Sequence, residues 1–168
     1  VLDEAGVPPG VFGVLHIDND QAAEVIGDAR VKAVSLTGSE RAGRSVAATA
    51  GKHLKKCVLE LGGSDPFVVL ADADLDKAVP AAVQSRFGNA GQTCIAAKRF
   101  IVVDAIADEF LRRFAEASAR LAVGDPNDDA TGLAPMARAD LRDELHKQVE
   151  ASLALGARAV LGCRPGAG

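Results

Sequence analysis

The sequence has few cysteines, no excess of basic charge and no long apolar run, and each of these absences argues against a class of protein. Its three cysteines are odd in number and lack metal-ligand spacing, so neither a disulfide framework nor a zinc site is expected. The 19 basic and 23 acidic residues give a formal net charge of -4, which predicts no nucleic-acid partner. No apolar run reaches the roughly 18 residues of a membrane helix, so no membrane partner is expected.

The first residues lack the charged-then-apolar layout of a secretory signal, so we expect a cytoplasmic protein with reduced thiols. The chain begins at Val1 without a methionine and inside a Gly/Pro turn, and it ends just after a strand-like run. We therefore expect the sequence to be a fragment of a larger protein.

Strand-like and helical patterns alternate along the chain, which is 48% hydrophobic, and this order predicts an α/β fold. The predicted strands cover residues 11–17, 32–37, 57–61, 66–70, 99–103 and 157–161. The predicted helices cover residues 19–26, 39–54, 72–87 and 139–155, together with an amphipathic helix marked by Ile106, Phe110, Phe114 and Leu121. A polar cap is expected at residue 19, and Pro80 is expected to kink its helix.

Two adjacent glycines, Gly62 and Gly63, separate the first series of strands and helices from the second. We expect the flanking runs, 57–61 and 66–70, to be two buried strands joined by a tight turn at these glycines. The sequence therefore predicts a domain boundary here, with residues 1–62 on one side and residues 63–168 on the other.

A strand-to-helix junction is predicted at Thr37, Gly38 and Ser39. Glycine lets the backbone approach a ligand closely, and the free N–H groups and dipole of a helix start favour a phosphate group. Taken alone, however, the segment fits an ordinary helix cap with Ser39 at the N-cap position better than a cofactor site.

A single carboxylate, Glu60, stands between Leu59 and Leu61 and before the two glycines. In such apolar surroundings it would be desolvated, and this would suit it to proton transfer near neutral pH. Taken alone, an outward-facing residue of an edge strand is the more common explanation.

Cys94 follows a polar segment, residues 87–93, that predicts an irregular loop after a helix. An isolated cysteine is usually a small buried side chain. Here Gly88 and Gly91 would hold the backbone open, present the thiol to a cleft and direct its own N–H toward a developing oxyanion. Cys57 and Cys163 lack such a setting and are expected to be structural.

Together these segments resemble the aldehyde dehydrogenase superfamily along essentially the whole chain. The resemblance rests on residues 4–11, 37–39, 59–63, 72–76 and 91–94, and on the gap of 34 residues between Glu60 and Cys94, which is usual in the family. It implies part of a Rossmann-type cofactor domain over residues 1–62, followed by part of the α/β catalytic domain over residues 63–168. The sequences of residues 63–67 and 94–100 are most similar to those of the succinate-semialdehyde dehydrogenase branch.

The resemblance also implies a mechanism: NAD(P)-dependent oxidation of an aldehyde to a carboxylic acid. Cys94 would form a thiohemiacetal with the aldehyde, a hydride would leave to the nicotinamide, and Glu60 would activate the water that hydrolyses the thioester. The cofactor, NAD or NADP, would contact Thr37, Gly38, Ser39, Leu61 and Gly62. The full-length protein would be a homo-oligomer whose substrate is a small aldehyde.

Some motifs of the family are missing from this sequence. The oxyanion-hole asparagine, the ribose-contacting lysine and a second glutamate lie outside it, and Gly88 stands where some succinate-semialdehyde enzymes have arginine. We therefore expect only part of the active site here. The alternative is a non-catalytic remnant of the fold that acts in assembly, in which a thiol probe would label Cys163 and not Cys94.

Overall fold

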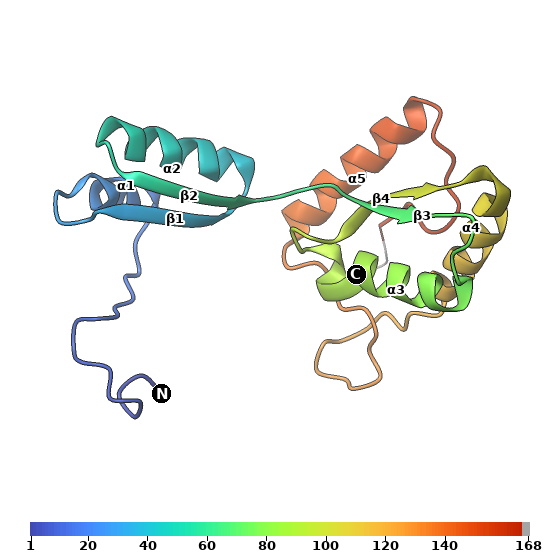
Figure 1. Ribbon diagram of the computed structural model, residues 1–168, viewed down its shortest axis with the longest axis horizontal. Coiled ribbons are helices and arrows are strands. Elements are labelled where there is room, and N and C mark those ends of the chain that lie inside the picture. The colour runs from blue at the N-terminus through green and yellow to red at the C-terminus, as the bar shows by residue number, and fades with distance from the viewer. Residues whose placement is uncertain (166–168) are drawn as a thin grey trace. The chain divides into compact units, whose positions relative to one another are not determined.

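The computed structural model of the chain describes residues 1–165 (Figure 1). The chain divides into two compact units, Val1–Leu61 and Gly62–Gly168. Each unit contains two parallel strands that are connected through a helix. The predicted α/β fold is therefore confirmed in both. The assignment of the first unit to a cofactor domain and of the second to a catalytic domain stays a prediction.

The first unit is built around a β-α-β arrangement. Strand β1 (Ala33–Gly38) pairs in parallel with β2 (Lys56–Leu61), and helix α2 (Glu40–Lys52) connects them. Helix α1 (Asn19–Gly27) precedes β1 and contacts α2. Figure 1 shows α2 lying along one side of the two strands.

The two faces of this sheet differ in burial because side chains alternate along a strand. On the face toward α2, Leu61 packs so closely that a Cβ on Gly43 would lie 2.8 Å from Leu61 Cδ2. The half-buried residues of the same face are Val34, Leu36, Cys57, Leu59 and Leu61. The residues of the opposite face are exposed and include Ser35, Thr37, Val58 and Glu60.

Both helices of the first unit begin at polar caps: the cap of α2 is Ser39, as predicted, and that of α1 is Asp18, one residue before the predicted position. Asp18 Oδ1 accepts a hydrogen bond of 2.9 Å from Gln21 N, and Gln21 Oε1 accepts one of 3.0 Å from Asp18 N, which is a capping box. Ser39 Oγ accepts a hydrogen bond of 3.3 Å from Ala42 N and so caps α2.

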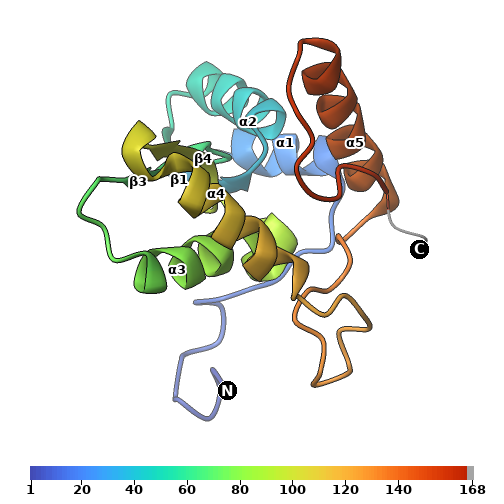
Figure 2. The same ribbon diagram turned by 90° about the vertical axis from the view of Figure 1, so that its right-hand side faces the viewer.

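The second unit repeats the β-α-β order. Strand β3 (Asp65–Val69) pairs in parallel with β4 (Ala97–Val102), and helix α3 (Leu75–Phe87) and the 3-10 turn η1 (Gly88–Gly91) lie between them in the chain. Helix α4 (Asp104–Ala119) follows and lies beside α3 (Figure 2). Helix α5 (Ala139–Ala154) has no buried residue.

A phenylalanine-rich core holds α3 and α4 to the strands of this unit. Val69, Val79, Ala82 and Phe110 are buried and in mutual contact, with Phe100 and Phe114 packed against them. The Phe100 and Phe114 ring centroids are 4.8 Å apart, and those of Phe110 and Phe114 are 5.8 Å apart. The predicted amphipathic helix is confirmed, except that Leu121 lies beyond its end.

Two predicted strands, at residues 11–17 and 157–161, are absent from the structure. Both segments are irregular and exposed, with Val11 70% and Val160 51% exposed. A strand is stable only when a neighbour completes its ladder of hydrogen bonds, and neither segment has a paired strand within residues 1–165. The prediction of these two strands, which rested on their apolar residues alone, is therefore wrong.

The tight turn predicted at Gly62 and Gly63 is also wrong. Strand β2 pairs with β1 and β3 pairs with β4, so the two strands beside these glycines belong to different sheets. The helix predicted from residue 72 begins at Leu75, because Asp74 caps it by accepting a hydrogen bond of 3.0 Å from Asp76 N. Pro80 lies inside this helix.

Within residues 1–165 no helix is both long and apolar enough to cross a membrane. No group of histidine, cysteine and acidic side chains in this part of the chain is arranged to bind a metal ion.

The core of the second unit gives a stability prediction. Phe110 is 3% exposed, and Phe110→Ala should lower the free energy of unfolding by about 3–5 kcal/mol because it leaves a cavity among packed rings. Leu111→Ala, at a neighbouring residue that is 36% exposed, should cost about 0.5 kcal/mol. Urea denaturation followed by circular dichroism measures both, since the sequence has no Trp or Tyr. Equal losses in the two variants would contradict the core assignment.

Candidate active site

Cys94 lies in a tight turn between η1 and β4. Ala96 N donates a hydrogen bond of 3.2 Å to the carbonyl of Thr93, which places Cys94 and Ile95 at the two central positions of a β-turn. The side chain of Cys94 is exposed. Within residues 1–165 the N–H of Cys94 donates to no backbone carbonyl. The turn therefore carries an exposed cysteine whose own N–H has no backbone acceptor in the described part of the chain.

The backbone before this turn is left-handed over three consecutive residues. Asn89, Ala90 and Gly91 have φ values of 53°, 54° and 74°. Gln92 Nε2 donates to the carbonyl of Asn89 at 3.1 Å, which links the two ends of this segment. The freedom of glycine predicted for this loop is needed at Gly91, but it is not needed at Gly88, whose φ is -52°.

The last turn of α3 bonds to both ends of the loop that contains Cys94. Arg86 Nη2 donates to the carbonyl of Gly91 at 3.2 Å, and Arg86 Nη1 donates to the carbonyl of Ala97 at 2.9 Å. Ser85 Oγ accepts a hydrogen bond of 3.3 Å from Ala97 N. Burial lowers the pKa of the Arg86 guanidinium, and the two carbonyls are its hydrogen-bond acceptors.

A second cation, Lys98, contacts the turn itself. Its Nζ lies 3.1 Å from the carbonyl oxygen of Thr93, 3.3 Å from that of Cys94 and 3.3 Å from that of Ala96. Sequence reasoning missed both Arg86 and Lys98. Their contacts are with backbone carbonyls, so no pattern of side-chain types signals them.

A glycine fits residue 63 because other atoms of the chain approach it closely, and not because the chain turns there. A Cβ on Gly63 would lie 3.3 Å from the carbonyl oxygen of Cys94 and 3.3 Å from Asp65 Oδ1. Such contacts are tighter than a side chain normally allows. The neighbouring Gly62 is exposed and meets no atom within 4 Å of an added Cβ.

Glu60 is the second-last residue of β2, where it is the register partner of Thr37 on β1. Of the two explanations that the sequence offered, the outward-facing strand residue is confirmed within the first unit and the desolvated carboxylate is not, since Glu60 is on the exposed face of the sheet. Its apolar neighbours Leu59 and Leu61 point to the opposite face, because side chains alternate along a strand. Glu60 and Cys94 lie in different units.

The candidate cofactor residues Thr37, Gly38 and Ser39 end β1 and cap α2, and all three are exposed. They lie at the carboxyl edge of a parallel β-α-β unit, which is where open α/β sheets bind ligands. The capping role of Ser39 is present, as described above. Leu61 and Gly62, the other candidates, follow Glu60 at the same end of β2.

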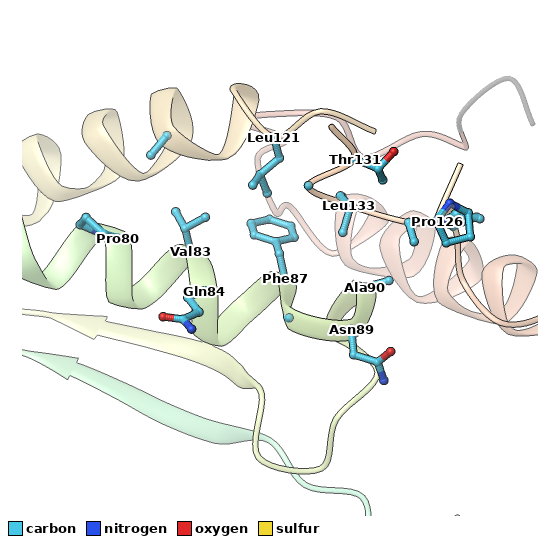
Figure 3. Close-up of a pocket in the computed structure, with 15 residues that line it drawn as sticks. Pro80, Val83, Gln84, Phe87, Asn89, Ala90, Leu121, Pro126, Thr131 and Leu133 are labelled. Carbon is cyan, nitrogen blue, oxygen red and sulfur yellow. The ribbon is translucent and has the colours of Figure 1, made fainter. Parts of the chain in front are cut away.

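A hollow of about 660 Å³ in the second unit contains neither candidate catalytic residue. It lies between the end of α3, the end of α4 and the loop around Leu133, and its wall is mostly apolar. Figure 3 shows Phe87 and Leu121 pointing toward each other across it. Asn89 and Ala90, before the Cys94 turn, also line it.

The sequence pattern of the aldehyde dehydrogenase family matches the chain over residues 1–168. This chain belongs to the aldehyde dehydrogenase family. Among its relatives is a succinate semialdehyde dehydrogenase for NAD(P)+ from Escherichia coli, 59% identical over 162 residues, which are 96% of this chain and 35% of the relative. Another is a succinate-semialdehyde dehydrogenase for NADP(+) from Mycobacterium avium, 50% identical over 98% of this chain and 35% of the relative.

A solved succinic semialdehyde dehydrogenase from Streptococcus pyogenes, in complex with NADP+, is similar to this aldehyde dehydrogenase chain with a TM-score of 0.93. The two are 43% identical, and the similarity covers 98% of this chain and 36% of that one. The predicted likeness to the succinate-semialdehyde dehydrogenase branch is thus confirmed. The chain spans about 35% of the length of the relatives named above.

The left-handed residue Gly91 gives a prediction for the loop of Cys94. In Gly91→Ala the added Cβ would lie 2.2 Å from Arg86 Nη2, at a φ that costs alanine about 1–2 kcal/mol. We expect the free energy of unfolding to fall by about 1–3 kcal/mol. Gly88→Ala is the control, since its added Cβ meets no atom within 4 Å. Urea denaturation of both variants tests the loop geometry, which an equal loss would contradict.

Proposed function

We propose that this chain carries the nucleophile, Cys94, and the general base, Glu60, of an enzyme that oxidises an aldehyde to a carboxylic acid with NAD or NADP. The observation that carries the proposal is the turn at Cys94, in which an exposed thiol and a free backbone N–H belong to the same residue. An acyl-transferring cysteine needs both groups, one to attack a carbonyl carbon and the other to stabilise the oxyanion.

The reaction that we propose begins at the thiolate of Cys94. Its sulfur bonds to the aldehyde carbon, the carbonyl electron pair moves to oxygen, and the N–H of Cys94 donates to that oxyanion. When bound, a nicotinamide cofactor supplies the hydride acceptor that the oxidation needs. Loss of hydride from the thiohemiacetal leaves a thioester on Cys94.

In the second half of the reaction Glu60 accepts a proton from water. The hydroxide oxygen bonds to the thioester carbon, the carbon–sulfur bond breaks, and the carboxylic acid leaves Cys94 as a thiolate. A general base must be reached by water, and the exposed position of Glu60 on β2 supports this role.

The residues at the β1–α2 junction fit a nucleotide pyrophosphate. Helix α2 has 13 residues, and its first N–H groups point toward the exposed segment Thr37, Gly38 and Ser39. The names of the relatives mention NAD(P)+ and NADP(+), which supports either cofactor for this chain.

Succinate semialdehyde is the substrate that we propose, because the relatives with 59% and 50% identity are named for it. We also propose that the full-length protein is a homo-oligomer in the cytoplasm. Cys57, Cys94 and Cys163 are free thiols in the structure, which supports a reducing compartment.

The roles of the two residues can be separated with an activated ester such as p-nitrophenyl acetate, which needs no cofactor. Cys94→Ala should abolish the burst of nitrophenol, because no thiol is acylated. Glu60→Gln should keep the burst and slow the steady release by about 10²- to 10⁴-fold, since the acyl group then leaves without a general base. Cys163→Ala, at the other exposed cysteine, and Glu40→Gln, at another exposed carboxylate, are matched controls.

Two further measurements test the reaction and its substrate. In the full-length protein, formation of reduced cofactor from succinate semialdehyde should exceed that from butyraldehyde, which has the same chain length without the carboxylate. Site-resolved labelling with a thiol reagent should favour Cys94 over Cys163 near neutral pH. Labelling of Cys163 with no burst at Cys94 would overturn the proposal and favour a non-catalytic remnant acting in assembly.

A further inference from the structure

The side chain of Lys98 reaches back from β4 to the turn that carries Cys94. A lysine ammonium has three N–H donors, and three carbonyl oxygens, those of Thr93, Cys94 and Ala96, lie within 3.1–3.3 Å of this one. The side chain of Lys98 is otherwise exposed. An exposed lysine usually contributes little to stability, so this convergence calls for a test of function.

We infer that Lys98 is a positioning residue for Cys94: its ammonium fixes the turn and places a positive charge next to the residue that bears the thiol. The inference rests on the proposed role of Cys94 as nucleophile. The carbonyl that accepts from Lys98 at 3.3 Å belongs to Cys94 itself, so the ammonium contacts the residue that carries the sulfur. A positive charge there attracts an anionic reactant.

The geometry also explains why a lysine suits this position. The three carbonyl groups follow one another around one turn, and a compact ammonium on a flexible stem can donate to all of them. Arginine at residue 98 would keep the charge and several donors, although in a planar arrangement. Methionine would keep the unbranched stem and lose both the charge and the donors.

Alkylation of Cys94 by two reagents, anionic iodoacetate and neutral iodoacetamide, separates charge from structure. At low ionic strength we expect Lys98→Met to lower the iodoacetate-to-iodoacetamide rate ratio at Cys94 by about 3- to 10-fold. Lys98→Arg should keep the ratio within about 2-fold of the unaltered chain. Site-resolved mass spectrometry follows Cys94, with Cys57 and Cys163 in the same sample as internal references.

Lys77→Met is the matched control. Lys77 is an exposed lysine in the first turn of α3, 3.0 Å from Asp74, and ten residues of helix place it about 15 Å from Phe87 at the other end. It should leave the ratio at Cys94 unchanged. An unchanged ratio in Lys98→Met, or an equal fall in Lys98→Arg, would overturn the inference.

If Lys98→Met unfolds the second unit, Lys98→Gln gives the same comparison with a polar side chain, and its ratio should also fall. The alkylation needs neither aldehyde nor cofactor. If the unaltered full-length protein had no dehydrogenase activity but Lys98→Met still lowered the alkylation ratio, only the proposed function would be contradicted. If the unaltered protein were active but Lys98→Met left the ratio unchanged, only the role of Lys98 would be contradicted.

Discussion

The hydrogen bonds between the last turn of α3 and the first residue of β4 are the constraint on which the candidate nucleophile depends. Arg86 and Ser85 bond to the carbonyl and the N–H of Ala97, and Arg86 also bonds to the carbonyl of Gly91. These contacts fix where the loop leaves the helix and where it enters the strand. Between the end of α3 and the start of β4, the chain consists of the left-handed residues and the turn at Cys94.

The core of the second unit makes these ends rigid. Ala82 of α3 is buried against Phe110 of α4 and Val69 of β3, so the helix that carries Arg86 has little freedom to shift. Local hydrogen bonds near the surface are usually weak, but here they act on a backbone that packing has already ordered. A surface loop can therefore present a thiol and an N–H group in a defined geometry, which is the requirement for oxyanion stabilisation.

The sequence predicted what depends on local residue types and missed what depends on distant partners. The β-α-β order, the cap at Ser39 and the irregular loop at Cys94 follow from alternation, capping chemistry and glycine positions. The failed strands 11–17 and 157–161 have suitable residues but no paired neighbour in the described chain. The sequence left the environment of Glu60 open between two explanations for a related reason, since adjacent leucines in a strand say nothing about the opposite face.

The two candidate catalytic groups depend on different parts of the chain. The contacts of the Cys94 loop all lie within the second unit: its backbone carbonyls accept from Arg86 and Lys98, and Gly63 approaches the carbonyl of Cys94. The position of Glu60 is set by β2 and its register with Thr37 in the first unit. In the mechanism that we propose, acylation of the thiol by an activated ester would require the order of the second unit alone. Oxidation of an aldehyde, which needs the cofactor at the β1–α2 junction, and hydrolysis of the thioester would require both units. A change that disturbs β1 or β2 should therefore affect deacylation before it affects acylation by an activated ester, which needs no cofactor.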